Sequence, residues 1–434
     1  MQEARILYIF TKNTSSLMNH SLIITIILLF FSYLGISQVE EVHPPNYIKT
    51  INFKGNTPET QLPILKLGDY LTLEFDALNG NEDDYYYKIE YYNADWTPSI
   101  LFKSEFMNGL DNQRIRTYEN SFNTYQIYSH YQLTIPNEQT KGLKVSGNYM
   151  IFIYNSYNEL MFSRKFMIYE DLAIVGVDIK RSRSIEFIEE KQRVDINISS
   201  NNIQFNNPKQ TVKAIIVQNN NLNTAIYNLQ PLFTIGNQLI YKYDSETSFW
   251  AGNEYLFFEN KDVRAANTGI QFIDLKELYH NYLFTNFSRK NRPYTYNPDI
   301  NGNYLITVVD AENPSIEADY VWMHFSLIPP KNLEPDSEIY IYGNFNNYVL
   351  DDSNKMIFDK EKNLYTNMML LKQGFYNYKY VVLNKNNVLD EGAISGNFYQ
   401  TENNYKVIVY YRDLGARYDK IIGIGEGSSI NISN

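Results

Sequence analysis

The sequence predicts an all-β protein built from three tandem immunoglobulin-like or E-set β-sandwich domains that follow a signal peptide. At 434 residues the chain exceeds what one hydrophobic core usually fills, so several domains are expected. Aromatic residues make up 15% of the chain, and 39 of its residues are tyrosines. Aromatic side chains favour pleated, half-buried surfaces, and tyrosine can bury its ring while its hydroxyl stays in water. Segments that alternate apolar and polar residues recur along the chain, as strands with one buried face require.

An apolar run near the N-terminus predicts an export signal. It extends from residue 22 to residue 34 and closes with the small residues Gly35 and Ser37. A run of about 13 residues is short for a spanning helix and is typical of a signal peptide. We therefore expect residues 1–37 to be a signal peptide cleaved after Ser37, with Met18 as an alternative start. An uncleaved N-terminal anchor is the other interpretation; otherwise no direct membrane span is expected.

The first domain is predicted over residues 44–170. Residues 71–75 alternate apolar and polar side chains, which is typical of a strand with one buried face. Asn79-Gly80 indicates a hairpin, because both central positions of a type I′ turn need a positive φ. Residues 149–154 are apolar on both faces and follow Gly147. This order of strands and turns favours an immunoglobulin-like sandwich.

A second sandwich is predicted over residues 171–328. Residues 194–198 and 320–327 alternate in the same way, and residues 212–217 form a nearly continuous apolar strand. The adjacent Pro329 and Pro330 cannot donate to a strand ladder, so we place a domain boundary there.

A third domain is predicted over residues 331–417. The remaining residues, 418–434, are mostly Gly, Ser and Asn with isolated Ile, and they predict a loose tail. Gly423, Gly425 and Gly427 are spaced like a phosphate-binding loop, but they open no helix, so no phosphate site is expected.

Charge and cysteine content exclude several classes of protein. The net charge of −11 repels phosphate backbones, so we expect no nucleic-acid partner. The chain has no cysteine, which rules out disulfides, thiolate catalysis and cysteine-based metal centres.

The sequence predicts neither an enzyme nor a metal or cofactor site. His43, His130, His280 and His324 are isolated in the sequence and show no metal-ligand spacing. The run at 82–84, Glu-Asp-Asp, could hold calcium with help from Asp76 and Asn81, but its spacing matches no defined loop and a solvated hairpin end is the simpler interpretation. Glycoside cleavage would need two paired carboxylates. Glu254, Glu317 and Asp319 are the candidates for such a pair, and no pattern pairs them.

Three residues are candidates for contact with a protein partner: Tyr86, Trp96 and Arg114. Exposed Trp, Tyr and Arg dominate interface hot spots. The competing interpretation of Trp96 is a core or corner residue, with Asp95 capping the turn before Pro98. We favour that interpretation for Trp96, and packing rather than recognition for Arg114.

Several short motifs, taken in order, carry a resemblance to a known family. They are Asn93-Ala94-Asp95-Trp96-Thr97-Pro98, Asn112-Gln113-Arg114-Ile115, Ser121-Phe122-Asn123-Thr124, Leu133-Thr134-Ile135-Pro136-Asn137-Glu138, Gly252-Asn253-Glu254-Tyr255 and Ile316-Glu317-Ala318-Asp319-Tyr320-Val321-Trp322. Over about residues 44–330 the chain resembles the type IX secretion system plug protein family. The resemblance implies a non-enzymatic periplasmic protein, peripherally associated with the outer membrane. Such a protein docks on the large translocon β-barrel and seals it when no cargo is passing.

A second resemblance leaves an alternative function open. Residues 339–348 and 374–380 resemble E-set modules of the glycogen- and starch-binding type, in which a Trp usually stacks on sugar. Tyr348 stands at that position here. The alternative is therefore a cell-envelope glycan-binding protein that uses its C-terminal module. A periplasmic assembly factor for the same secretion system is a third interpretation.

Overall fold

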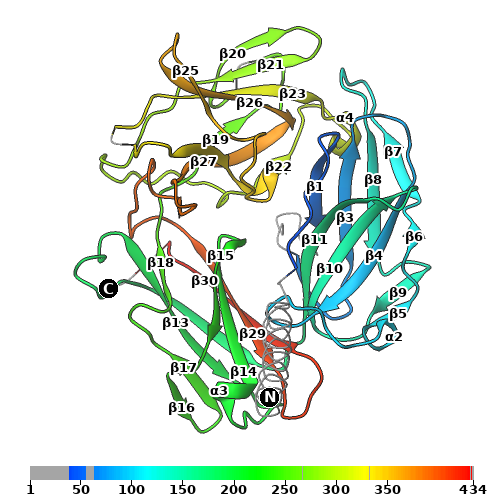
Figure 1. The fold of residues 1–434 in the computed structure, drawn as a ribbon, viewed down its shortest axis with the longest axis vertical. Helices are drawn as coiled ribbons and strands as arrows, with labels where there is room; N and C mark the ends of the chain where they lie inside the picture. Colours follow the sequence, from blue (N-terminus) through cyan, green and yellow to red (C-terminus); the bar gives the residue numbers. More distant parts are fainter. Residues whose placement is uncertain (1–38, 55–62, 266, 332, 431, 433–434) are drawn as a thin grey trace, which may run out of the picture.

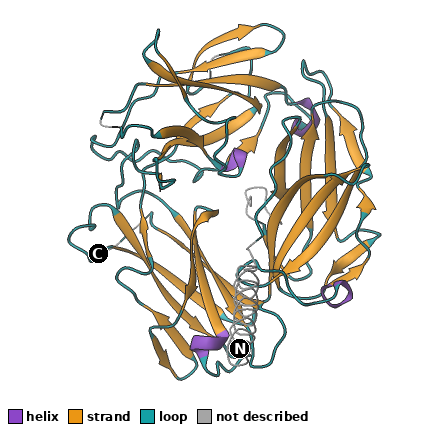
Figure 2. Ribbon diagram, in the orientation of Figure 1, coloured by secondary structure: helices purple, strands orange, loops and turns teal. Residues whose placement is uncertain are grey.

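The chain folds into three β-sandwiches that sit like the corners of a triangle (Figure 1). The computed structural model describes residues 39–54, 63–265, 267–331, 333–430 and 432, so the predicted signal peptide and its cleavage site lie outside the described residues. Nearly all regular structure in these ranges is strand (Figure 2), which confirms the all-β prediction. The helices of the described ranges are single turns: α2 (Lys103–Phe106), α3 (Pro208–Thr211), α4 (Pro314–Glu317) and the 3-10 turn η1 (Asn344–Asn346). Within the same ranges, no helix has the length and apolarity needed to cross a membrane.

The first domain, residues 39–170, packs a sheet of order β1-β3-β8-β7 against a sheet of order β2-β11-β10-β4-β6, with β5 and β9 paired at one end. Leu71, Leu73 and Phe75 of β3 point into the core, as their alternation predicts, and the inner face of β10 covers them. The strands are β1 (Ile48–Lys54), β2 (Ile64–Lys66), β3 (Leu71–Ala77), β4 (Tyr85–Tyr92), β5 (Met107–Gly109), β6 (Gln113–Arg114), β7 (Thr117–Asn120), β8 (Ser129–Ile135), β9 (Thr140–Leu143), β10 (Gly147–Asn155) and β11 (Leu160–Tyr169).

The second domain combines residues 171–250 with residues 404–432. One sheet has the order β12-β13-β17-β16 with β18 beside β13, and the other has the order β15-β14-β29-β30. The strands are β12 (Ile174–Arg181), β13 (Lys191–Ser199), β14 (Val212–Gln218), β15 (Asn221–Leu229), β16 (Phe233–Ile235), β17 (Gln238–Tyr241), β18 (Ser248–Trp250), β29 (Asn404–Tyr411) and β30 (Lys420–Ser428).

The third domain, residues 256–390, is inserted into the second. One of its sheets has the order β20-β21-β23-β26-β25, and the other joins β19, β22, β24 and β28 to β27. The strands are β19 (Leu256–Glu259), β20 (Ile270–Leu275), β21 (Tyr279–Leu283), β22 (Tyr304–Ile306), β23 (Tyr320–Leu327), β24 (Glu338–Tyr342), β25 (Ile357–Asp359), β26 (Leu364–Lys372), β27 (Gly374–Leu383) and β28 (Leu389–Asp390).

The predicted boundary at Pro329-Pro330 is wrong, and so is the tandem order of the second and third domains. β23, before the prolines, pairs with β26, after them, and β14 pairs with β29 some two hundred residues further along the chain. The E-set module predicted over 331–417 therefore has no sheets of its own. Two adjacent prolines stop a strand ladder, but here they lie in a connection between the two sheets of a single sandwich.

The predicted loose tail over 418–434 is also wrong, because most of it is β30. Gly423, Gly425 and Gly427 alternate along this strand and present one bare face to β12. A Cβ atom at Gly425 would lie 2.6 Å from the backbone oxygen of Val175. The glycines therefore let two strands approach closely, which is a packing role rather than a sign of disorder.

Candidate functional site

A concave surface lies where the three domains meet. A cavity of about 1790 Å³ opens between them. Each domain supplies part of its wall: the first through Lys49 and Ile51, the second through Tyr227, and the third through Trp322 and Asn347. What holds the three domains around this cavity decides whether the molecule acts as one body.

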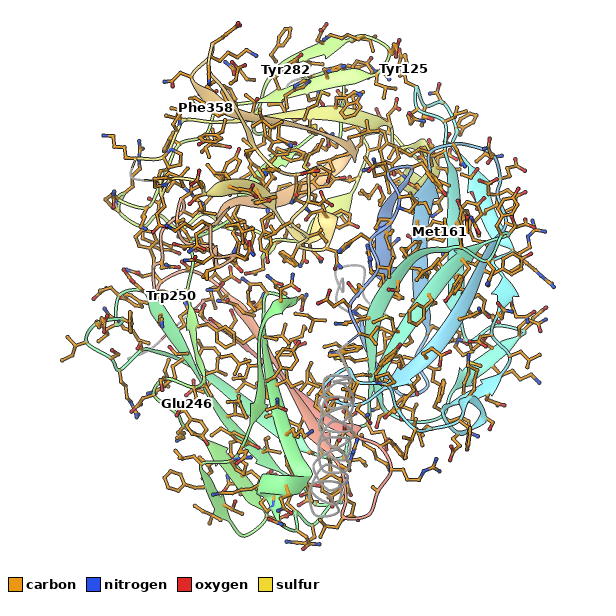
Figure 3. All side chains as sticks on the ribbon, in the orientation of Figure 1. Tyr125, Met161, Glu246, Trp250, Tyr282 and Phe358 are labelled. Atoms are coloured by element: carbon orange, nitrogen blue, oxygen red, sulfur yellow. The ribbon has the colours of Figure 1, made fainter. Side chains whose placement is uncertain are left out.

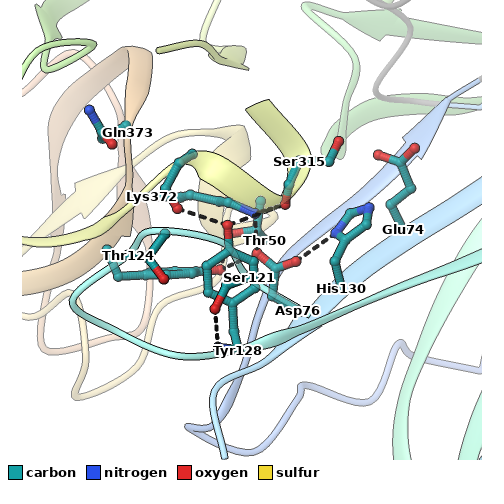
Figure 4. Close-up of polar contacts among 12 residues, drawn as sticks. Thr50, Glu74, Asp76, Ser121, Thr124, Tyr128, His130, Ser315, Lys372 and Gln373 are labelled. Atoms are coloured by element: carbon teal, nitrogen blue, oxygen red, sulfur yellow. Dashed lines mark hydrogen bonds and ion pairs between the residues drawn. The ribbon is translucent and has the colours of Figure 1, made fainter. Parts of the chain in front are cut away.

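The first and third domains meet at a polar contact that we call the seam; it comprises Thr50, Asp76 and residues 122–130 of the first domain, and residues 315–320 and Lys372 of the third. Its centre is Asp76, at the end of β3 (Figure 4). The Oδ2 atom of Asp76 lies 2.6 Å from the ammonium nitrogen of Lys372 and accepts a hydrogen bond of 2.6 Å from the hydroxyl of Tyr320. Asp76 and Lys372 are fully buried, so this is a desolvated ion pair between two domains.

Neighbouring groups complete the shell around this ion pair. His130 Nδ1 lies 2.7 Å from the other oxygen of Asp76. The hydroxyls of Thr50 and Tyr320 are 2.6 Å apart, and because Tyr320 gives its proton to Asp76, Thr50 is the donor. Lys372 also donates to the carbonyl of Ser315 and lies 4.2 Å above the ring of Tyr128. Burial acts to raise the pKa of Asp76, but the charge of Lys372 and the bond with His130 outweigh it, so the pKa lies below its usual value.

A second carboxylate, on the third domain, holds the loop between β7 and β8. Asp319 accepts hydrogen bonds from the backbone N–H groups of Tyr125 and Gln126, at 3.0 to 3.2 Å. The N–H of Phe122 donates to the carbonyl of Ile316 at 2.9 Å. Figure 3 labels Tyr125 at the end of this loop, where its ring meets the ring of Tyr279 edge to face. The seam thus combines paired charges, amides and hydroxyls with a few aromatic rings.

The junction between the first and second domains is apolar instead. Met150 and Met167 of the first domain pack with Ile215, Val217 and Ile408 of the second in a shared buried cluster. This explains why residues 212–217 are apolar on both faces: one face of β14 fills the core of its own sandwich and the other covers the first domain. A buried polar contact also lies within this junction: the hydroxyl of Tyr410 donates to the Oδ1 atom of Asn148 at 2.7 Å.

The second and third domains are joined by two chain crossings, residues 251–255 and 391–403, which hydrogen-bond to each other. The N–H of Phe398 donates to the carbonyl of Gly252, and the side chain of Asn253 donates to the carbonyl of Ser395, both at 2.8 Å. Glu254 is buried between the crossings and accepts from the N–H of Glu402 at 3.1 Å. These bonds tie the outgoing and returning chain into one connection.

Tyr348 does not offer a surface for sugar. Its side chain is 4% exposed, its ring packs against Tyr342, and its hydroxyl donates to the carbonyl of Asn219 in the second domain. The expectation that this ring stacks on a glycan is wrong, because the inserted third domain presses it against the second.

The three candidate partner residues lie in two different places. Trp96 is 2% exposed and belongs to the buried cluster between the first and second domains, so it is a junction residue and not an exposed contact. Tyr86 and Arg114 face each other across β4 and β6, and Arg114 is exposed with an ion pair of 2.6 Å to Asp84. The role of Tyr86 and Arg114 in contacting a partner therefore stays a prediction.

Other residues singled out in the sequence are brought together or separated by the fold. His280 and His324 are not isolated: the parallel pairing of β21 and β23 sets their ring nitrogens 2.8 Å apart. Burial, reinforced by His280, lowers the pKa of His324 to about 4.

The fold does not pair the candidate carboxylates. The carboxylate of Asp319 is buried at the seam, whereas Glu254 lies at the chain crossings. Among the described residues, no group of three or more acidic or histidine side chains could hold a metal ion.

Sequence reasoning named Asp76 only as an oxygen ligand in the calcium interpretation, and it did not single out Lys372. Asp76 is a carboxylate in the otherwise core-forming strand β3, and Lys372 follows the apolar residues 368–371. A charge at the end of an apolar run is the signal that could have identified Lys372, since buried charges are normally paired. Asp76 falls on the polar face of the alternation in residues 71–75, so no such signal marked its burial. Their pairing across 296 residues could not be read from the sequence.

Comparisons with known proteins identify relatives of the chain. Residues 48–170 match the family described as the type 9 secretion system plug protein 1st domain. The crystal structure of a hypothetical protein from Parabacteroides merdae is 33% identical, covers 90% of this chain and 100% of its own, and superposes with a TM-score of 0.86. A biofilm-associated protein domain covers 91% of this chain and 61% of its own, at 8% identity and a TM-score of 0.17, which carries no argument. No curated protein matches the chain.

Proposed function

Because the chain belongs to the type IX secretion system plug protein family, we propose that it docks on the outer-membrane translocon barrel of that system and seals the barrel when no cargo is passing. Membership of the family gives the chain a role associated with type IX secretion. The sealing role, the periplasmic location at the outer membrane and the absence of catalysis are the parts that we propose. The observation that carries the proposal is the match of the whole first domain to the plug family.

The physical properties of the molecule support this role. A plug must keep its shape against a pore, and three sandwiches that each contact the other two form a broad body. The buried apolar junction holds the first and second domains together as one body. A plug must also leave when cargo arrives, which favours a partly polar docking surface over an obligate apolar one.

A capture experiment tests the proposal. The tagged mature chain would be crosslinked mildly in native envelopes and purified in detergent, and its partners would be identified by mass. We expect one very large β-barrel to be recovered, and less of it when the secretion system is loaded with cargo. An untagged strain is the control. A variant that lacks the third domain would not serve, because that domain is inserted between the two segments of the second domain. Recovery of other envelope proteins without a barrel would contradict the proposal.

A further inference from the structure

The seam differs from the other two junctions in that no chain crosses it. The chain passes from the first domain to the second once, near residues 170–174, and between the second and third domains twice. It never passes directly between the first and third. The closure of the triangle therefore rests on noncovalent contacts alone.

The chemistry of the seam also differs. Each apolar cluster of the described residues lies within one domain or joins the second domain to the first; none joins the first domain to the third. A junction that resembles a domain core stays closed, because opening it exposes apolar surface to water. The cluster of Met150, Met167 and Ile215 is such a junction.

Opening the seam would instead return polar groups to water. Asp76 and Lys372 would regain the hydration that burial took from them, and the N–H groups of Tyr125 and Gln126 would exchange Asp319 for water. The desolvation of a buried ion pair offsets much of its mutual attraction, and a hydrogen bond exchanged for one with water changes the free energy little. The rings of Tyr128 and Tyr320, each 1% exposed, meet edge to face and form the apolar part of the seam.

We propose that the first and third domains separate at the seam while the first and second domains move as one body. The two crossings at 251–255 and 391–403 form the hinge. In the open form the wall of the central cavity formed by β1 becomes accessible. The inference concerns the chain by itself and goes beyond docking on a translocon, so it stands or falls separately from the proposed function.

Distances between spin labels on the purified mature chain test this proposal. The chain has no cysteine of its own, so each introduced cysteine is labelled uniquely. One pair, Lys141→Cys with Glu361→Cys, reports on the first and third domains; a second pair, Lys141→Cys with Glu186→Cys, reports on the first and second. All three positions are exposed.

Two substitutions should open the seam. With Asp76→Asn, we expect the long-distance population of the first pair to rise at least tenfold over the unsubstituted chain, while the second pair keeps its distance. Tyr320→Phe removes the hydroxyl that bonds to Asp76 and Thr50 but keeps the ring, and serves as the milder variant if Asp76→Asn does not fold. Asp111→Asn is the matched control, because Asp111 pairs with Lys103 inside the first domain.

Two results would overturn the proposal. One is a single short distance for the first pair in both seam variants. The other is a lengthening of both label pairs together, which would mean that the domains loosen everywhere.

Discussion

Replacing Lys372 with methionine should destabilise the chain strongly, because it leaves the carboxylate of Asp76 buried without its lysine partner. Methionine keeps the length and most of the volume of the lysine stem. The variant loses the ion pair at 2.6 Å, the bond to Ser315 and the contact with the ring of Tyr128. Removal of one partner from a buried pair typically costs about 3–5 kcal/mol. We expect a loss of that size in the free energy of unfolding.

Urea unfolding followed by tryptophan fluorescence measures this loss, because each domain holds one tryptophan: Trp96, Trp250 and Trp322 in order. The double variant Lys372→Met with Asp76→Asn removes both charges and should recover at least half of the loss. A loss below about 1 kcal/mol for Lys372→Met, or no recovery in the double variant, would refute the reasoning that a charge pair holds the seam.

Three further predictions concern other parts of the chain. Gly425→Ala should lower stability by about 1–3 kcal/mol in a thermal scan, because the new Cβ atom meets the backbone of Val175. Gly176→Ala is the control: the nearest atom to its new Cβ is 3.7 Å away, so stability should change little. Burial raises the pKa of Asp299 to about 7, so the folded protein binds this proton more tightly than the unfolded chain does. Stability should therefore fall by up to about 4 kcal/mol as pH rises from 4 to 7, and Asp299→Asn should flatten that slope in urea titrations. Arg114→Ala should change stability by less than about 0.5 kcal/mol, because its ion pair is solvent-exposed; a larger loss in the same assay would indicate a structural role.

The sequence predicts the strands better than their partners. Alternation within residues 71–75 and 194–198 identifies core strands correctly, because the period of two depends only on neighbouring residues. The double-faced apolar pattern of residues 212–217 predicts burial on both sides, although not that the first domain covers one of them.

Long-range pairing explains what the sequence could not predict. The return of the chain to the second domain depends on β14 finding β29 after the third domain is complete, and no local pattern records that. The glycines of β30 predict a loose tail from the sequence alone, because the strand β12 that packs against them lies far away in the chain. The centre of the seam likewise joins Asp76 to Lys372 across most of the chain, so only the burial of Lys372, which follows an apolar run, was open to prediction.

Electrical conductance of the purified translocon barrel, reconstituted in a planar lipid bilayer, tests the central claim most directly. Addition of the mature chain to the periplasmic side should reduce the open-pore current in proportion to occupancy, and washing the chain out should restore it. Addition to the opposite side serves as the control. An unchanged current at saturating concentrations of chain, with binding to the barrel verified separately, would contradict the claim that this protein seals the pore.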